Sequence, residues 1–293
     1  MIYLLLSIIL HVAIFLIFRF YAIYKIDRLG AIIVNYIVCV LTGLIFLRDF
    51  AKISSVGFET PWIPWAIATG ALFVFTFNLM AYCTQVFSVT VSSVSSKIAL
   101  VIPVVFSLFI LKIGVEGFTL FNYIGILLAL SAVVLTSYQE NKENIHVSGL
   151  IKWLVPLGVF VFSGFIDVIL NYANYAMIPS EEEKVYPIFA FLSAAIFGLV
   201  ALLIRRKKVG IRSVIAGIIL GIPNYFSIYF LLKALSSFEN NGAVLYPFLN
   251  IGIILTSALF SVILFKERLS GINKLGLLFA VIAIILISFG GFL

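Results

Sequence analysis

Charged residues are scarce in this chain. Asp, Glu, Lys and Arg make up 11% of its 293 residues, whereas soluble domains average about 25%. So few charges cannot cover the surface of a water-soluble domain, and 63% of the residues are hydrophobic. The composition therefore predicts an all-α integral membrane protein whose main solvent is the lipid bilayer.

Residues that perform catalysis or hold metals are also few. Cys39 and Cys83 lie in separate apolar segments without metal-site spacing, and His11 and His146 are the two histidines. The apolar segments contain no paired carboxylates, no histidine cluster and no nucleophile beside a base. A glycine-rich phosphate loop is missing too. The sequence therefore predicts neither an enzyme nor a bound cofactor or metal.

The basic balance of the chain does not indicate nucleic-acid binding. Its net charge is +7, but most lysines and arginines lie at the ends of apolar segments, where they set membrane orientation. The chain lacks a domain in which basic and aromatic residues contact bases. We expect the lipid bilayer and a small-molecule substrate as partners and no nucleic acid. The oligomeric state stays open, a monomer included.

The apolar residues fall into ten segments, each close to the roughly 20 residues that cross a bilayer as a helix. They are Ile2–Arg19, Gly30–Leu47, Trp62–Gln85, Val89–Leu111, Phe118–Ser137, Leu150–Tyr172, Val185–Ile204, Val214–Ser236, Gly242–Phe265 and Ile272–Leu293. The first has no basic n-region and no cleavage site, so it is predicted to be a retained span. The connections are too short for a separate soluble domain.

Lysine and arginine are unevenly distributed over the connections. Those after the first, fifth, seventh and ninth segments, with their flanks, hold thirteen, and those after the second, fourth, sixth and eighth hold five. Because basic loops stay in the cytoplasm, this bias places the first group inside and both termini outside. We expect a multi-pass protein of the cell membrane.

The chain contains an internal repeat. A shift of 151 residues aligns residues 116–137 with residues 267–288, and eight of the 22 positions are identical. Each copy contains five apolar segments, and an odd number inverts the second copy in the membrane. We therefore predict ten transmembrane helices as two inverted five-helix repeats, residues 1–140 and 147–293, as in secondary transporters. The identical pairs are Glu116/Glu267, Asn122/Asn273, Gly125/Gly276, Leu127/Leu278, Ala129/Ala280, Ala132/Ala283, Leu135/Leu286 and Ser137/Ser288.

Residues 265–288, with their weaker copy at 116–137, resemble EamA-type members of the drug/metabolite transporter superfamily. In that family each repeat ends in a glycine-glutamate-arginine-leucine motif followed by a glycine-bearing last helix. Lys266 stands at the usual glycine position. The resemblance implies a ten-helix carrier of small molecules, usually an exporter, with cytoplasmic termini, which conflicts with the charge bias. The matching residues are Glu267, Arg268, Leu269 and Gly276 in the second copy and Glu116 and Gly125 in the first.

The fourth segment carries the strongest site candidate. It contains a lysine, Lys97, and a proline, Pro103, within an otherwise apolar run. A cation at membrane depth is costly and usually faces a bundle interior or a watery cavity, and Pro103 frees a backbone carbonyl. We predict that Lys97 binds a carboxylate or phosphate of the substrate. A side chain that snorkels to the nearer membrane surface is the alternative.

Two further ionisable residues are candidates for proton or ion coupling. Asp167 shares a helix face with Asn171 and Asn174 at i, i+4 and i+7, which predicts a polar stripe toward the bundle. Asp167 is either the proton or cation site or a structural counter-ion of Lys97. His11 lies near the middle of the first segment and can carry a proton near neutral pH. Hydrogen-bonded packing is the simpler role for this histidine.

Amide and tyrosine side chains lie at similar depth in several segments. Such amphipathic linings suit small polar ligands, although interhelical hydrogen bonding explains each of them singly. Pro223 and Pro247 either kink their helices or bare backbone groups at the site. The predicted substrate-binding residues besides Lys97 are Asn35, Asn78, Tyr82, Asn224, Tyr229, Tyr246 and Asn250.

Other features are predicted to be structural. Glu116 and Glu267 stand at helix ends, where a carboxylate favours the dipole of the helix that follows. Residues 181–183 form an acidic, solvated loop. Small-residue pairs indicate helix-packing contacts, namely Ala66/Gly70, Ala194/Gly198 and Gly217/Gly221.

These features favour a secondary transporter that moves a small metabolite, such as an amino acid or organic anion, by alternating access. The resemblance to EamA-type carriers implies that the direction is export. The 15% aromatic content equally suits a multidrug or hydrophobic-cation efflux carrier of the same fold. An intramembrane headgroup transferase is less favoured because the apolar segments hold no catalytic constellation. A channel is less favoured because it would need a symmetric pore-lining ring.

Overall fold

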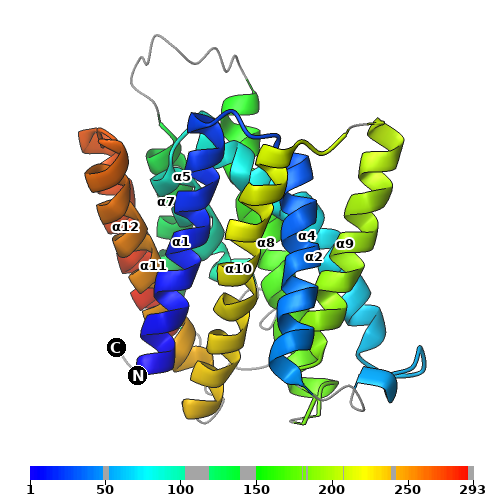
Figure 1. Cartoon of the computed structure of the whole chain (residues 1–293). Coiled ribbons are helices and arrows are strands. Elements are labelled where there is room, and N and C mark those ends of the chain that lie inside the picture. The colour runs from blue at the N-terminus through cyan, green and yellow to red at the C-terminus, as the bar shows by residue number, and fades with distance from the viewer. Residues whose placement is uncertain are drawn as a thin grey trace. The chain divides into compact units, whose positions relative to one another are not determined.

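The computed structural model describes residues 1–48, 53–102, 119–138, 150–179, 181–182, 184–206, 208–238 and 242–289, and within them the chain forms helices and turns without strands. Figure 1 shows the helices coloured along the chain. In chain order the elements are α1 (Ile2–Ile23), α2 (Arg28–Leu47), α4 (Ile63–Val86), α5 (Val89–Lys97), the 3₁₀ turn η1 (Ile98–Leu100), α7 (Leu120–Ser137), α8 (Ile151–Ala176), α9 (Tyr186–Arg205), α10 (Ile211–Ser237), α11 (Gly242–Phe265) and α12 (Gly271–Phe289).

The helices have the length and surface of membrane spans. In the described residues, eight are long and apolar enough to cross a bilayer, and two shorter apolar helices, Val89–Leu100 and Leu120–Thr136, fall in the fourth and fifth predicted segments. Large apolar side chains such as Ile45 and Leu203 are 71% and 76% exposed, which suits contact with lipid tails. The prediction of an all-helical, multi-pass membrane protein is confirmed at this level.

Some sequence predictions fall outside the described residues. Pro103 and the rest of the fourth segment lie there, as does Glu116. The predicted boundary between the repeats, residues 140–147, also lies outside the described part of the chain.

The chain forms two compact units. Unit 1 comprises Met1–Asn78 and Val168–Ala234, and unit 2 comprises Leu79–Asp167 and Leu235–Leu293. Each unit therefore combines helices from both predicted repeats. Unit 1 packs α2 against α9, and unit 2 packs α5 against α11 and α7 against α12. Each of these pairs joins one segment of the first predicted repeat to the segment at the same place in the second.

The pairing of α7 with α12 in unit 2 is reciprocal. Asn122, near the start of α7, donates to two carbonyl oxygens near the end of α12, at 3.2 and 2.8 Å. Asn273, near the start of α12, donates to two carbonyl oxygens near the end of α7, at 3.2 and 3.0 Å. The helices are therefore antiparallel, and a shift of 151 residues maps one set of bonds onto the other. The acceptors are Leu286 and Ile287 in α12 and Leu135 and Thr136 in α7.

Small repeated residues bring these two helices close together. A Cβ atom on Gly125 would lie 3.0 Å from the backbone nitrogen of Ile287, and one on Gly276 would lie 2.8 Å from that of Thr136. Four alanines, also repeated, lie fully buried in the core of unit 2. The repeat therefore has a packing cause, since small side chains allow the close backbone approach that membrane helices use in place of a hydrophobic drive. The alanines are Ala129, Ala132, Ala280 and Ala283.

Unit 1 contains a second reciprocal contact, between α2 and α9. A Cβ atom on Gly43 would lie 2.7 Å from the Ile188 side chain, and one on Gly198 would lie 2.6 Å from that of Ile33. A shift of 155 residues relates both the two glycines and the two isoleucines. Since the end of each helix meets the start of the other, α2 and α9 are also antiparallel.

The predicted small-residue contacts of unit 1 follow the same rule. A Cβ atom on Gly70 of α4 would lie 2.6 Å from the carbonyl oxygen of Ala190, and one on Gly221 of α10 would lie 2.9 Å from that of Asn35. Gly217 likewise contacts α2. The prediction that these glycines are helix-packing contacts is confirmed.

The third pair, α5 and α11 in unit 2, is joined by hydroxyl groups. The Thr90 and Ser261 hydroxyls lie 3.0 Å apart, and Ser257 donates to Ser93 at 2.6 Å. Residues early in α5 therefore meet residues late in α11, so these helices are antiparallel as well. All four side chains are fully buried. Each hydroxyl gives its neighbour a partner that the apolar surroundings would not supply.

The connection between α11 and α12 corrects one prediction. Glu267 does not cap the helix that follows it, because its Oε1 accepts the backbone N–H of Val89 at the start of α5, at 3.2 Å. The start of α12 is capped instead by Ser270 and Asn273, which bond each other reciprocally. Lys266 has a φ of 51°. Glycine adopts this left-handed conformation freely, whereas a residue with a side chain there costs about 1 kcal/mol.

The close contact of α12 with α7 predicts a strong effect of Gly276→Ala. The new Cβ would collide with backbone atoms of Thr136, so we expect the free energy of unfolding to fall by about 1–3 kcal/mol. Thermal unfolding in detergent, followed by circular dichroism, measures the change. Gly271→Ala is the control because a Cβ there meets nothing within 4 Å. Equal stability of the two variants would contradict the close-packing account.

Candidate functional site

Lys97 ends a regular helix within unit 2. It is the last residue of α5, and the chain continues through the tighter 3₁₀ turn η1, Ile98–Leu100. A 3₁₀ stretch inside a membrane-spanning helix often marks a hinge, because its i→i+3 hydrogen bonds have poorer geometry than the i→i+4 bonds of an α-helix. The Lys97 side chain is half-buried. The break therefore follows directly after the charged residue.

Asp167 lies close enough to Lys97 for their charges to interact. It is a half-buried residue of α8, and the two opposite charges lie within range of each other. Ser163, one turn before Asp167, donates to Ser96, the neighbour of Lys97, at 3.2 Å. This hydroxyl bond fixes α8 beside the end of α5. Within the described residues no direct ion pair joins the two charges.

Residues of α11 complete the surroundings of this pair. The Tyr246 phenol is half-buried and lies within range of the Asp167 charge. Asn250, one turn further along, is buried. Pro247 lies between them inside the helix. Within unit 2, Asp167 thus lies within range of both Lys97 and Tyr246, and Asn250 follows Tyr246 by one turn on the same helix. We refer to these four as the charged site.

Asn35 and Asn224 lie in unit 1 and bond each other. The Asn224 amide donates to Asn35 Oδ1 at 3.1 Å, and both side chains are buried. Cys39 donates to the same oxygen and to the carbonyl of Gly221. In this conformation the two amides join α2 to α10, which is the simpler of the two predicted roles.

His11 is also engaged in helix packing. Its Nδ1 lies 2.8 Å from the carbonyl oxygen of Ser7, one turn earlier in α1. Ser7 in turn donates to the carbonyl oxygen of Ser227 in α10, at 3.2 Å. The histidine therefore belongs to a contact between α1 and α10 in unit 1.

The other predicted residues are dispersed. Asn78 donates to the carbonyl oxygen of Val74 in its own helix, at 2.8 Å. Tyr82 is half-buried on α4. Tyr229 packs edge-on against Phe46, with ring centroids 4.8 Å apart. The side chains of Asn171 and Asn174 lie outside the described part of the structure.

Several residues have polar roles that the sequence pattern did not predict. Four serines in the run from Val89 to Lys97 are buried, and this hydroxyl-rich pattern was the available signal. Glu182, predicted to be solvated, accepts a hydrogen bond from the indole of Trp62, a fully buried side chain. Both residues belong to unit 1, so Glu182 gives a buried indole of that unit its hydrogen-bond partner.

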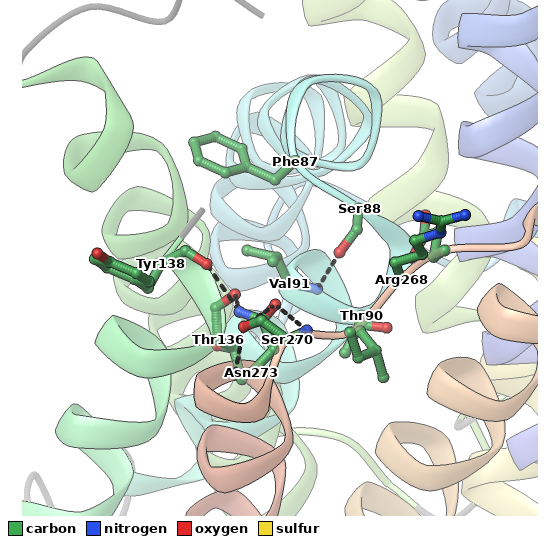
Figure 2. A pocket seen from close by; sticks show the side chains of 11 residues that line it. Phe87, Ser88, Thr90, Val91, Thr136, Tyr138, Arg268, Ser270 and Asn273 are labelled. Atoms are coloured by element: carbon green, nitrogen blue, oxygen red, sulfur yellow. Dashed lines mark hydrogen bonds between the residues drawn. The ribbon is translucent and has the colours of Figure 1, made fainter. Parts of the chain in front are cut away.

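A pocket of about 310 Å³ opens at one end of unit 2 (Figure 2). It lies where α4 ends, where α5 and α12 begin and where the chain passes from α11 to α12. Its polar walls include Arg268, Ser88 and Ser270, and Phe87 and Tyr138 supply aromatic rings. None of the predicted substrate-binding residues lines it.

Comparison with known proteins supports the fold and leaves the activity open. No protein-family model matches the chain. An uncharacterized protein of Haemophilus influenzae is 27% identical over 262 residues, which cover 87% of this chain and 86% of that protein. One crystal structure aligns with 96% of this chain and 95% of its own at a TM-score of 0.58 and 14% identity. That structural likeness concerns the fold alone.

The amide pair predicts a measurable coupling between α2 and α10. We expect a double-mutant cycle of Asn35→Leu and Asn224→Leu to give a coupling free energy of about 0.6–1.7 kcal/mol, the range for polar contacts between membrane helices. Thermal unfolding in detergent supplies the four stabilities. Asn78→Leu, whose amide bonds its own helix, is the control and should not couple to Asn35→Leu. A coupling of zero for the amide pair would favour a binding role instead.

Proposed function

We propose that this protein is a secondary transporter that moves a small anionic or zwitterionic metabolite, such as an organic anion or amino acid, across the cell membrane. The observation that carries the proposal is the pair of half-buried opposite charges, Lys97 and Asp167, among membrane-spanning helices of unit 2. Charged groups at membrane depth are costly, and they mark solute or ion pathways more often than structural sites.

The proposal includes ten spans in two inverted five-helix repeats. The reciprocal contacts within each unit support it, because α2 with α9 and α7 with α12 are antiparallel pairs of equivalent segments. Equivalent segments that face each other across a local two-fold have two near-identical arrangements available. Exchange between these arrangements is the physical basis of alternating access.

Each residue of the charged site has a chemical role in this mechanism. The Lys97 ammonium attracts a carboxylate or phosphate, and its attraction is strong where water is excluded. Asp167 balances that charge in the absence of substrate and binds a cationic group or a proton when substrate is present. Tyr246 and Asn250 offer hydrogen bonds to the uncharged part of the solute. The breaks at η1 and Pro247 leave backbone carbonyls for the same purpose.

Transport energy would come from the solute gradient, from exchange or from protons. Asp167 is the proposed coupling group because its carboxylate can take up a proton and lies within range of the Lys97 charge. His11 is a weaker choice, since its ring already bonds within the α1–α10 contact. Export as the direction, and membership of the EamA-type carriers, remain part of the proposal and rest on the resemblance of the motif at Lys266–Leu269.

A hydrophobic-cation efflux carrier of the same fold is the second candidate. An aromatic cluster in unit 1 favours it, where the Tyr229 ring contacts Phe46, Phe226 and Phe230 with centroids 4.8 to 6.3 Å apart. Aromatic faces attract cations.

Substitution of Lys97 tests the charge preference. In proteoliposomes we expect Lys97→Ala to reduce the flux of organic anions at least about tenfold, because the loss of one charge contact of 1.4 kcal/mol has that effect. Radiolabelled uptake is measured against a panel of amino acids, sugars, organic anions and cationic dyes. Lys208→Ala, an exposed loop residue, is the control. Anion flux that is unchanged in Lys97→Ala would remove the charge-based preference, and dye flux alone would favour the second candidate.

Substitution of Asp167 tests coupling. Asp167→Asn keeps the shape of the side chain but cannot release a proton, so we expect exchange of labelled for unlabelled substrate to continue while uptake driven by a pH gradient disappears. A pH-sensitive dye trapped in the vesicles measures proton movement with the substrate. Proton movement that persists in Asp167→Asn at the parental ratio would assign the coupling to another group.

A further inference from the structure

The pocket at the end of unit 2 and Lys97 of the charged site are connected by one face of helix α5. Thr90 lines the pocket, and Ser93 and Lys97 follow it at i+3 and i+7 on α5. Because an α-helix repeats every 3.6 residues, these three side chains share one face. Seven residues at a rise of about 1.5 Å place Lys97 about 10 Å deeper than Thr90 along the helix axis.

Two hydroxyl pairs lie between the pocket and Lys97. Thr90 pairs with Ser261 at 3.0 Å, and one turn deeper Ser93 pairs with Ser257 at 2.6 Å. The four side chains are fully buried, so α5 and α11 are in close contact at this level. Such hydroxyl pairs contribute little net stability in a membrane protein. Their separation therefore costs less than the separation of two interlocked apolar faces.

The rim of the pocket carries an excess of positive charge. Arg268 lines it with an exposed side chain. Lys266 on the same connection and Lys274 in the first turn of α12 are exposed as well, but neither lines the pocket. The one acidic lining residue, Glu267, is buried and already accepts the N–H of Val89. Figure 2 shows Arg268 and Ser88 on the same side of the pocket, where Ser88 caps α5. The accessible charge at the pocket is therefore that of the arginine.

We propose that this pocket is a vestibule in which Arg268 holds the anionic group of a solute or lipid headgroup outside the closed Thr90–Ser261 and Ser93–Ser257 pairs. The inference rests on the proposed transport function, and it adds a second anion site that is distinct from Lys97. Separation of α5 from α11 would then open a path of about two helical turns from Arg268 to Lys97. Arg268 thus becomes a specificity residue for anions.

Thiol labelling tests the charge preference without any need for a known substrate. The two native cysteines, Cys39 and Cys83, are buried and give a low background. Leu269→Cys places a thiol in the pocket wall. The substitution leaves in place the side-chain hydrogen bonds that cap α5 and α12. This thiol is labelled with two methanethiosulfonate reagents, an anionic sulfonatoethyl and a cationic trimethylammonium compound. Each labelling rate is compared with the rate of the same reagent on a free thiol in solution.

We expect the anionic reagent to be favoured at Leu269→Cys. Addition of Arg268→Gln should lower the anionic rate and raise the cationic rate, each by about fivefold, the effect of one unit charge at close range in water. Lys274→Gln is the control and should change the ratio less, because its charge lies outside the pocket and is screened. A ratio that Arg268→Gln leaves unchanged, or that the control changes equally, would overturn the proposal.

Two further labelling experiments identify the source of the anion and test whether the two hydroxyl pairs are closed. Protection of Leu269→Cys by inorganic phosphate or L-glutamate would indicate a small solute, and protection by phosphatidylglycerol in phosphatidylcholine vesicles would indicate a lipid headgroup. Lack of protection by all three would overturn the anion site. Ser93→Cys should resist labelling under conditions that modify Leu269→Cys, and rapid labelling would overturn the closed pairs.

Flux measurements separate this inference from the proposed function. If the vestibule lies on the pathway, Arg268→Gln raises the KM for the transported anion at least about fivefold and leaves the maximal rate near that of the parent. Flux that depends on Lys97 but shows an unchanged KM in Arg268→Gln would overturn the vestibule alone. Absence of any flux in the parent would overturn the proposed function, and the labelling ratio would still decide the anion site.

Discussion

The structure depends on the absence of water from the bilayer interior, which obliges each polar group to find a partner inside the protein. Asn122 and Asn273 satisfy this constraint by bonding carbonyl groups at the far end of the opposite helix. The carbonyls at a helix end have no partner in their own helix. One amide therefore both satisfies a helix end and sets the register of α7 against α12.

The internal duplication makes this solution available twice. When two copies of a segment meet across a local two-fold, any contact between residues i and j occurs again between their equivalents. Gly125 and Gly276 therefore meet equivalent residues of the opposite helix, and Gly43 and Gly198 do so in unit 1. The glycine contacts bring backbones within van der Waals distance. The α5–α11 pair, in contrast, is joined by hydroxyl hydrogen bonds.

The charged site differs from these helix contacts, in which polar groups are directly paired. Lys97 and Asp167 are half-buried and lie within range of each other, although a direct ion pair would offset more of the cost of removing both charges from water. Helix α5 also loses its regular form immediately after Lys97. Among the described residues, two opposite charges without a direct ion pair thus lie beside a stretch of irregular backbone. A solute that supplies the missing contacts gives this arrangement a physical reason.

The sequence by itself determined the class of protein, the approximate helices and the small residues of the close contacts, because hydropathy and helical period are local properties of the chain. It also pointed to Lys97, Asp167 and Tyr246, which lie within range of one another in unit 2 through Asp167. Only the tertiary structure decided which polar groups are already in use. Asn224 bonds Asn35 across 189 residues of sequence, and Glu267 caps α5 rather than α12 across 178. Such partners depend on the register between distant helices, which no local pattern encodes.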